Sequence, residues 1–322
     1  MFFMFIIAGH EQVVVNKFKQ FDCVVDYSDH YYYHQSKPNQ KSNSHGTMMI
    51  NNRNTMKRIM KEWEILEKNL PASIFVRVYE GRIDLLRAAI IGASKTPYHN
   101  GLFFFDLQFP SDYPNNPPKV YYRSFGLRLN PNLYNSGYVC LSLLNTWGGK
   151  GTERWCPDKS TILQVLLSLQ GLVLNEKPYY NEPGIKPAWS WESYNADVFA
   201  LSCKTMLYLM KKPARNFEGF IAAHFRDHAS VILKACVAYW NGRVRIGLFD
   251  GDAPVGSKKK KVNVSKKFKD SMNELYPELY KAFNRIGASV KNLPEKLEDD
   301  GDGKPANGII GKLKRFWEAM TT

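Results

Sequence analysis

The sequence predicts an α+β domain in which one antiparallel sheet is covered by helices, and three observations support this class. An amphipathic helical pattern begins near residue 53, four short β-branched or aromatic runs follow it, and apolar helical patterns return after residue 160. Glycine or proline separates the four runs, so the strands are expected to form a meander with short turns. With 322 residues, the chain is long enough for one medium domain and substantial flanks.

The first helix is predicted over residues 53–70, and the four strands follow it. Pro71 ends the helical pattern, and lysine and glutamate occupy many of the positions between the apolar residues. The apolar residues at helical spacing are Met56, Ile59, Met60, Trp63, Leu66 and Leu70. The strands are predicted at 74–79, 85–91, 102–109 and 119–122.

Further helices complete the predicted domain after a long irregular stretch. A buried helix is expected over 161–174, with Ser160 or Thr161 as its N-cap, because a hydroxyl oxygen there accepts a hydrogen bond from a free amide of the first turn. Two more helices are expected near 193–211 and 215–240 from their apolar periodicity.

The two ends of the chain differ from the middle in composition. A tract rich in Tyr, His, Ser, Asn and Gln predicts that residues 1–52 form a flexible N-terminal arm. Residues 53–212 are expected to form the main domain and residues 213–245 a C-terminal helical extension. Residues 246–322 are expected to be a basic, largely disordered tail, with a short basic amphipathic helix near 311–320.

The formal net charge of +14 favours acidic partners. No nucleic-acid-binding motif accompanies the charge, so no specific nucleic-acid partner is expected, although the basic tail is suited to peripheral contact with an anionic membrane. A transmembrane segment is not expected, because the apolar start at residues 1–9 is much shorter than the roughly 20 residues that span a bilayer. This short start suggests a truncated or mis-started N-terminus.

Five widely spaced cysteines, with no pair in a CxxC pattern, argue against a disulfide framework and against a zinc ribbon. His224 and His228 stand one helical turn apart, but a third ligand is not evident, so no metal site is expected. A thiol used as a nucleophile must stay unpaired, which favours a reducing compartment, the cytoplasm or the nucleus.

Two short motifs carry a family resemblance. The first is the proline-rich run Phe109-Pro-Ser-Asp-Tyr-Pro at the end of a predicted strand. The second is Asn130-Pro131-Asn132, followed eight positions later by Cys140 within Gly-Tyr-Val-Cys-Leu. Together they resemble the ubiquitin-conjugating enzyme (E2) family, and the stretch after Cys140 resembles its large members, including plant phosphate-homeostasis-type enzymes and E2/E3 hybrids.

The resemblance implies the UBC fold, with an N-terminal helix, a four-stranded antiparallel meander, an active-site loop and C-terminal helices. It also implies that Cys140 accepts ubiquitin from an E1 activating enzyme as a thioester and passes it to a substrate lysine, with or without an E3 ligase. ATP would be consumed by the E1, and no cofactor would bind this chain directly. By the same resemblance, Asn132 would hold the oxyanion or the loop, and Glu182 would orient the lysine amine or accept its proton, with Tyr179 and Tyr180 lining the channel.

The sequence departs from the family at two positions and leaves alternatives open. Asn130 stands where the family usually has histidine, and Ser142 stands where many members have aspartate. Cys156 is a rival nucleophile, although no acyl-transfer motif surrounds it. A Cys-His protease would need a histidine base near Cys140, and none is present in the motifs. A catalytically inactive E2-like scaffold that binds ubiquitin or a ligase is the other alternative.

Overall fold

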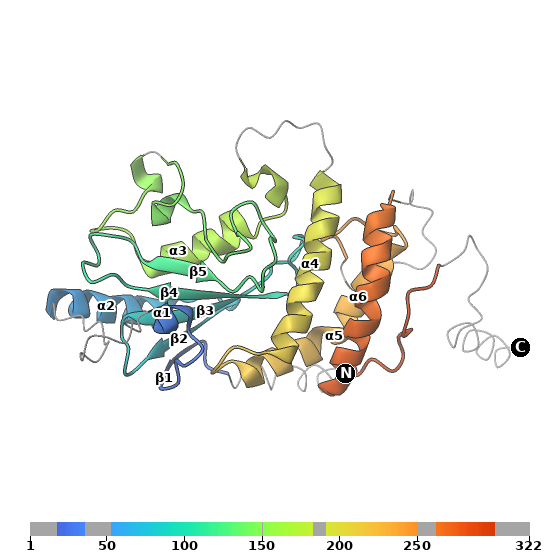
Figure 1. The fold of residues 1–322 in the computed structure, drawn as a ribbon, viewed down its shortest axis with the longest axis horizontal. Helices are drawn as coiled ribbons and strands as arrows, with labels where there is room; N and C mark the ends of the chain where they lie inside the picture. Colours follow the sequence, from blue (N-terminus) through green and yellow to red (C-terminus); the bar gives the residue numbers. More distant parts are fainter. Residues whose placement is uncertain are drawn as a thin grey trace, which may run out of the picture.

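The computed structural model describes residues 18–35, 53–149, 151–182, 191–249, 251 and 262–299. A five-stranded sheet lies at its centre, and the strands stand in space in the order of the sequence (Figure 1). The strands are β1 (Phe21–Val24), β2 (Ile74–Tyr79), β3 (Leu85–Ile91), β4 (Leu102–Gln108) and β5 (Lys119–Tyr122). Strands β2 to β5 pair antiparallel, which confirms the predicted four-stranded meander.

Strand β1 pairs parallel with β2 and was not predicted. It belongs to the part of the chain expected to be a flexible arm, and that expectation is wrong for residues 18–35. Contacts distant in sequence hold this segment: Gln20 Nε2 donates to Pro71 O at 2.7 Å, and Arg77 Nη1 donates to Lys19 O at 2.9 Å. Residues 1–17 and 36–52 of the expected arm lie outside the described residues.

Four predicted helices are present with nearly the predicted bounds. They are α2 (Arg53–Asn69), α3 (Ile162–Ser168), continued by a π-helical turn (Leu169–Val173), α4 (Trp191–Lys211) and α5 (Glu218–Trp240). Thr161 is the N-cap of α3, as predicted, and it shares reciprocal hydrogen bonds with Gln164. A short helix, α1 (Tyr31–Gln35), precedes them. No helix in the described ranges is both long and apolar enough to cross a membrane.

Helix α6 (Lys266–Arg285) corrects the prediction of a disordered tail over this part of residues 246–322. Its side chains that pack against α4 and α5 are Phe268, Met272, Leu275, Tyr276, Leu279 and Phe283. Pro277 lowers the helix propensity, but burial of this apolar face offsets that cost. The helix predicted near 311–320 lies outside the described residues.

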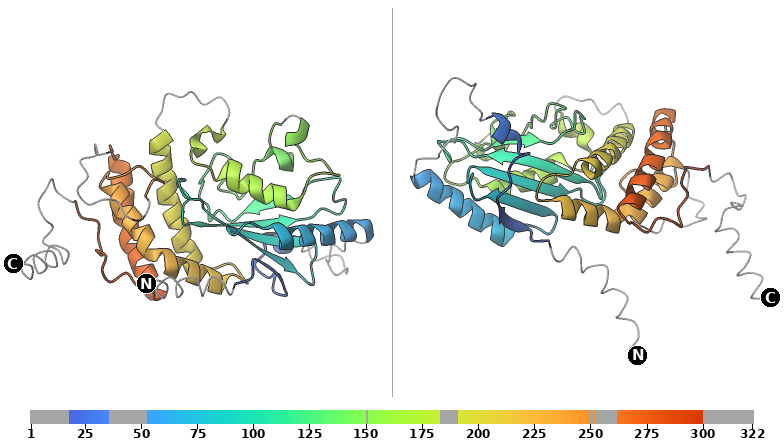
Figure 2. Two further views of the ribbon diagram at one scale, coloured as in Figure 1. Left: turned by 180° about the vertical axis from the view of Figure 1, so that it is seen from behind. Right: turned by 60° about the horizontal axis from the view of Figure 1, so that its bottom comes forward.

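Side chains that alternate along the strands are buried on both faces of the sheet. One face packs against α2 and α3, where Val76 and Val78 meet Ile59 and Leu166. The opposite face packs against α4 and α5, where the Phe75 ring lies 4.3 Å from the ring of Phe220, and α6 packs in turn against α4 and α5. Seen from behind, α4, α5 and α6 lie together at one end of the sheet, and α2 lies at the other (Figure 2). The strands are therefore mostly apolar along both faces, with Arg77, Arg87 and Asp106 as buried charged exceptions.

A buried charge cluster fastens the first described segment to that second face. Arg87 on β3 is fully buried and donates to both carboxylate oxygens of Asp106 on β4, at 2.6 and 2.9 Å. Its Nη1 donates to Asp29 at 2.6 Å, and Arg123 Nη1 donates to the other Asp29 oxygen at 2.9 Å. The backbone amide of Tyr31 donates to Asp106 at 2.8 Å. Residues 29–31 are thus held by paired charges rather than by an apolar contact alone.

Candidate active site

The loop that carries Cys140 is tied to the preceding turn by backbone hydrogen bonds. Leu133 and Val139 form an antiparallel bridge, and the Cys140 amide donates to Asn132 O at 2.9 Å. On the other side, Thr146 Oγ1 donates to Val139 O at 2.8 Å and accepts from the Leu141 amide at 2.9 Å. Cys140 is therefore held at a defined position, with 4% of its surface exposed.

Asn132 and Cys140 are brought together as the sequence predicts. The Asn132 side chain donates from Nδ2 to Cys140 O at 3.0 Å. Its Oδ1 is buried and has no hydrogen-bond partner. The amide therefore fixes the thiol loop in this state, and it would have to release the Cys140 carbonyl to donate to an oxyanion. Its role toward the oxyanion stays a prediction.

The side chain of Asn130, which stands where the family usually has histidine, holds the turn that carries Asn132 through hydrogen bonds. It is fully buried, and its Nδ2 donates to Tyr98 Oη at 2.9 Å and to Val173 O at 2.7 Å. Its Oδ1 accepts from the Asn132 amide at 2.8 Å. These hydrogen bonds hold Asn132 against the end of the π-helical turn. Asn130 therefore fixes the position of the turn where the family usually has histidine.

The segment before Glu182 joins the same hydrogen-bond network. Asn181 Nδ2 donates to Val173 O at 3.0 Å and to Asn130 Oδ1 at 3.3 Å. Asn175 Nδ2 donates to Asn181 Oδ1 at 2.6 Å. Glu182 follows directly after a 3₁₀ turn (Pro178–Asn181) and is exposed. The structure thus places Glu182 at the end of an anchored segment next to the Asn130 turn.

A tyrosine that the sequence did not single out lies in the turn between Asn132 and Cys140. The Tyr134 amide donates to Tyr138 O at 3.0 Å, and Tyr134 influences the pKa of the Cys140 thiol. Burial raises the pKa of the Cys140 thiol, whereas Tyr134 and the charge of Arg128 oppose that rise. The pKa of Tyr134 itself is raised, first by Cys140 and to a smaller extent by Glu182, so the Glu182 carboxylate lies within electrostatic reach. No sequence motif marks this placement of Tyr134, because it depends on how the turn at 135–137 folds back.

The two tyrosines expected to line the channel, Tyr179 and Tyr180, lie in the 3₁₀ turn just before Glu182. Tyr179 packs against Tyr194 of α4, with ring centroids 5.6 Å apart, and Tyr180 remains partly exposed beside it. Asn195 of α4 donates to Glu176 O at 2.8 Å and fixes the start of this segment. The segment from Glu176 to Glu182 is therefore held by α4 on one side and by the Asn130 turn on the other.

The other four cysteines lie outside the loop that carries Asn132 and Cys140. Cys156 lies in a turn, where its amide donates to Ser160 Oγ at 2.9 Å. Cys203 and Cys236 are fully buried between α4 and α5, and Cys23 is exposed on β1. Within the described ranges, no group of three or more His, Cys, Asp or Glu residues could hold a metal ion.

His224 and His228 form a stacked pair in α5. Their ring centroids are 4.3 Å apart, and His224 is buried. Burial and then the neighbouring His228 lower the pKa of His224 to about 3, so the buried ring is neutral at physiological pH. Its Nε2 lies 2.9 Å from Asn100 O, which ties α5 to the loop before β4.

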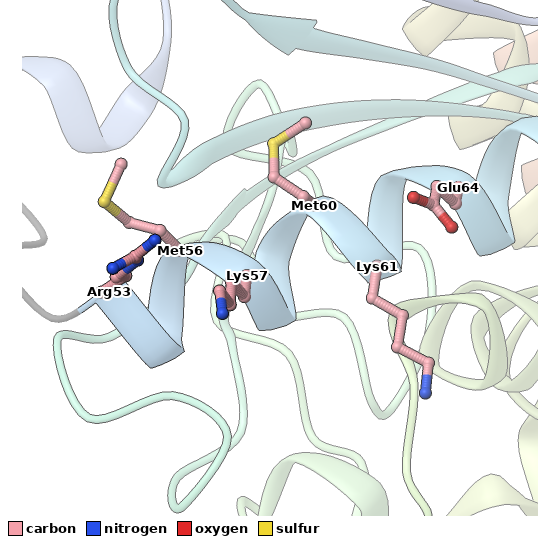
Figure 3. A pocket seen from close by; sticks show the side chains of 6 residues that line it. All are labelled: Arg53, Met56, Lys57, Met60, Lys61 and Glu64. Carbon is pink, nitrogen blue, oxygen red and sulfur yellow. The ribbon is translucent and has the colours of Figure 1, made fainter.

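The exposed side of α2 lies outside the loop of Cys140 and carries two methionines. Met56 and Met60 are each more than 40% exposed, and they lie beside the basic side chains of Arg53, Lys57 and Lys61 along a shallow hollow (Figure 3). Exposed methionines adapt their shape to a partner, and the surrounding cations favour acidic side chains. This side of α2 is suited to a protein partner with apolar and acidic residues.

Comparison with known proteins assigns the chain to a family. Residues 58–204 match the family model described as ubiquitin-conjugating enzyme. The chain is 47% identical over 298 residues to the putative ubiquitin-conjugating enzyme E2 38 of Arabidopsis thaliana. The aligned region covers 88% of this chain and 85% of that protein. The chain belongs to the ubiquitin-conjugating enzyme (E2) family. The UBC fold implied by the motifs is thereby confirmed for this E2.

Other relatives of this E2 are longer proteins. It is 53% identical over 232 residues to the probable ubiquitin-conjugating enzyme E2 25 of Arabidopsis thaliana, covering 70% of this chain and 37% of that protein. It is 40% identical over 195 residues to the human dual E2 ubiquitin-conjugating enzyme/E3 ubiquitin-protein ligase BIRC6, covering 56% of this chain and 4% of that protein. The predicted resemblance to plant E2 enzymes and to E2/E3 hybrids is confirmed by these matches.

Proposed function

We propose that Cys140 of this E2 accepts ubiquitin from an E1 as a thioester and passes it to a lysine of a protein substrate. The observation that carries this proposal is the pairing of Asn132 with Cys140 through two hydrogen bonds, of 2.9 and 3.0 Å. That pairing holds the loop of the thiol in one conformation and places a side-chain amide on the Cys140 carbonyl. A positioned thiol supplies the nucleophile of acyl transfer through a thioester, and a nearby amide can support its oxyanion once it releases the carbonyl.

The chemistry has two steps. In loading, the Cys140 thiolate attacks the carbonyl carbon of the E1–ubiquitin thioester, and the E1 thiol leaves as a thiolate. In discharge, the neutral lysine amine attacks the new thioester, Cys140 leaves as a thiolate, and the amine loses a proton. Asn132 would support the oxyanion formed in discharge, and Glu182 would orient the amine or accept its proton. ATP is consumed by the E1, and this chain binds no cofactor of its own in the proposed reaction.

The partners and location follow from this chemistry. Ubiquitin and an E1 are required, and an E3 ligase, a substrate or both supply the acceptor lysine. An intrinsic ligase activity is a further part of the proposal, which the similarity to a dual E2/E3 enzyme supports. A nucleophilic thiol that must stay reduced supports action in the cytoplasm or the nucleus.

Incubation of purified Cys140→Ser protein with E1, ATP and ubiquitin tests the proposal by gel shift. The wild-type chain should form an adduct that a thiol reductant removes, whereas Cys140→Ser should form no adduct or a reductant-resistant oxyester, because an alkoxide is a poorer leaving group. Cys156→Ser is the matched control and should load normally.

Two outcomes would overturn the assignment. A reducible adduct on Cys140→Ser would move the nucleophile to another cysteine. A wild-type chain that binds ubiquitin but never forms an adduct would support the alternative of an inactive scaffold.

A further inference from the structure

The carbonyl of Val173 lies at the end of the π-helical turn, where the chain leaves the helix. The last carbonyls of a helix have no partner within it, and Val173 is buried. Two side-chain amides donate to this oxygen, Asn130 Nδ2 at 2.7 Å and Asn181 Nδ2 at 3.0 Å. One buried acceptor therefore joins the turn that carries Asn132 to the segment that ends at Glu182.

The same two asparagines also contact each other. Asn181 Nδ2 donates to Asn130 Oδ1 at 3.3 Å, and this Oδ1 also accepts from the Asn132 amide at 2.8 Å. Asn132 in turn donates from its side chain to Cys140 O at 3.0 Å. A continuous series of hydrogen bonds therefore links Asn181 to the backbone of the cysteine.

Backbone groups determine the orientation of the amide at position 181. Asn175 Oδ1 accepts from the Lys177 amide at 3.0 Å, so Asn175 Nδ2 is the atom that donates to Asn181 Oδ1, at 2.6 Å. The Nδ2 of Asn181 then faces Val173 O, which can only accept. Position 181 therefore needs a side chain that accepts on one side and donates on the other. An ionised aspartate has the same size but no donor.

We propose that Asn181 is a positioning residue for the discharge step. It holds the neighbouring Glu182 in place relative to Cys140, because both segments share one anchor, the Val173 carbonyl. The inference rests on the proposed function, since it assumes that Cys140 carries the ubiquitin and that Glu182 acts on the lysine amine.

Glu182 is exposed and directly follows Asn181 in the chain. The start of the segment is held separately, because Asn195 of α4 donates to Glu176 O at 2.8 Å. Loss of the Asn181 hydrogen bonds should therefore loosen Glu182 while Glu176 stays in place. Displacement of a catalytic group by about 1 Å can cost about a hundredfold in rate, so a loosened group is expected to cost about tenfold.

Loading should not depend on Asn181. The loop of the thiol keeps its own hydrogen bonds when Asn181 is replaced, including the one from the Cys140 amide to Asn132 O at 2.9 Å. Loading needs the thiol, whereas discharge also needs the lysine amine to lose a proton, which is the step assigned to Glu182. Replacement of Asn181 should therefore separate the two steps.

Hydrogen exchange followed by mass spectrometry tests the anchor in the full chain without ubiquitin. Asn181→Ala should exchange faster than wild type in residues 175–182 and at the wild-type rate around Cys140. Asn116→Ala is the matched control, because Asn116 is an exposed loop residue whose side chain donates to Asp112. Exchange in residues 175–182 equal to that of wild type would overturn the proposal.

Single-turnover assays measure loading and discharge separately. Asn181→Ala should load within about twofold of wild type and discharge ubiquitin to free lysine about tenfold more slowly near pH 7. Asn181→Asp keeps an acceptor for Asn175 but places an oxygen against Val173 O, so its discharge should be at least as slow. Discharge at the wild-type rate by either variant would overturn the proposal.

Two further readouts separate the positioning of Glu182 from a general loss of structure. A higher pH should restore discharge by Asn181→Ala, as it should for Glu182→Gln, because more lysine is then neutral. In the Glu182→Gln background, Asn181→Ala should slow discharge by less than about twofold, since the group that it positions is already absent. A defect of equal size at every pH, or two defects that multiply, would show that Asn181 does not act through Glu182.

Failure of this inference can be distinguished from failure of the proposed function. A reducible adduct on Cys140→Ser would overturn the nucleophile assignment and this inference with it. If Cys140 is the nucleophile and Glu182→Gln discharges at the wild-type rate, the thioester function stands, but Asn181 has no acid to position and the inference fails.

Discussion

Replacing Asp29 with alanine should destabilise the chain by about 2 kcal/mol, because Asp29 joins residues 18–35 to the sheet. Its carboxylate accepts from Arg87 at 2.6 Å, from Arg123 at 2.9 Å and from the Arg215 amide at 3.2 Å. Removing one partner of a buried ion pair typically costs about 3–5 kcal/mol. The cost should be smaller here, since Asp106 still pairs with Arg87 and the Asp29 side chain is 23% exposed.

Thermal unfolding of the full chain, followed by circular dichroism, measures this cost. For a chain of 322 residues, about 2 kcal/mol corresponds to a decrease in Tm of roughly 3–4 °C. Asp197→Ala is the matched control, because Asp197 forms an ion pair of 2.7 Å with Lys267 at the surface, where such pairs contribute about 0–1 kcal/mol. A decrease for Asp29→Ala no larger than for Asp197→Ala would refute the role of the charge cluster.

The same experiment has an expected pH dependence. Burial opposes ionisation of Asp29, but Arg87 and then Arg123 outweigh it and hold the pKa of Asp29 below its ordinary value. A lowered carboxyl pKa contributes stability above the unfolded-state pKa, near 4, and that stability is lost as the pH falls below it. The difference between wild type and Asp29→Ala should therefore be full at pH 6 and shrink below about pH 4.

Two further predictions concern the catalytic loop. Asn132→Ala should still load ubiquitin but discharge it to lysine at least about tenfold more slowly in a single-turnover assay, because discharge depends on stabilising the oxyanion. Equal slowing of both steps would indicate that the hydrogen bond from Asn132 to Cys140 O serves only the fold. Glu182→Gln should load normally and discharge slowly near neutral pH, and a higher pH should restore the rate because more lysine is then neutral. A discharge rate equal to that of wild type at every pH would leave Glu182 as a solvated loop charge.

The sequence predicted the parts of the fold that depend on local pattern. Strands β2 to β5 have breaks at glycine or proline and side chains typical of strands, so their bounds were predicted to within about one residue. Asn132 and Cys140 were also predicted, because a motif of fixed spacing places them together. Local periodicity and short motifs are readable without knowledge of the rest of the fold.

The parts that were missed depend on contacts between distant segments. Strand β1 contains only four residues, and its partner β2 lies about 50 positions later in the chain. Helix α6 contains Pro277 and follows a lysine-rich stretch, so its helical apolar face was overlooked. The position of Tyr134 near the active-site loop depends on the turn at Gly137, and a tyrosine in a loop carries no such signal by itself.

The covering of the second face of the sheet has a consequence for how the chain is made. The ring of Phe18, in the first described segment, lies 6.0 Å from Phe75 on β2 and 4.9 Å from Phe220 on α5. During synthesis Phe220 leaves the ribosome about 145 residues after Phe75. At typical rates of 5–20 residues per second, this face would stay uncovered for roughly 7–30 seconds. The nascent chain should therefore expose Phe75 to solvent for that interval, and Phe104 for a shorter one, and should bind chaperones that recognise exposed aromatic residues until α5 emerges.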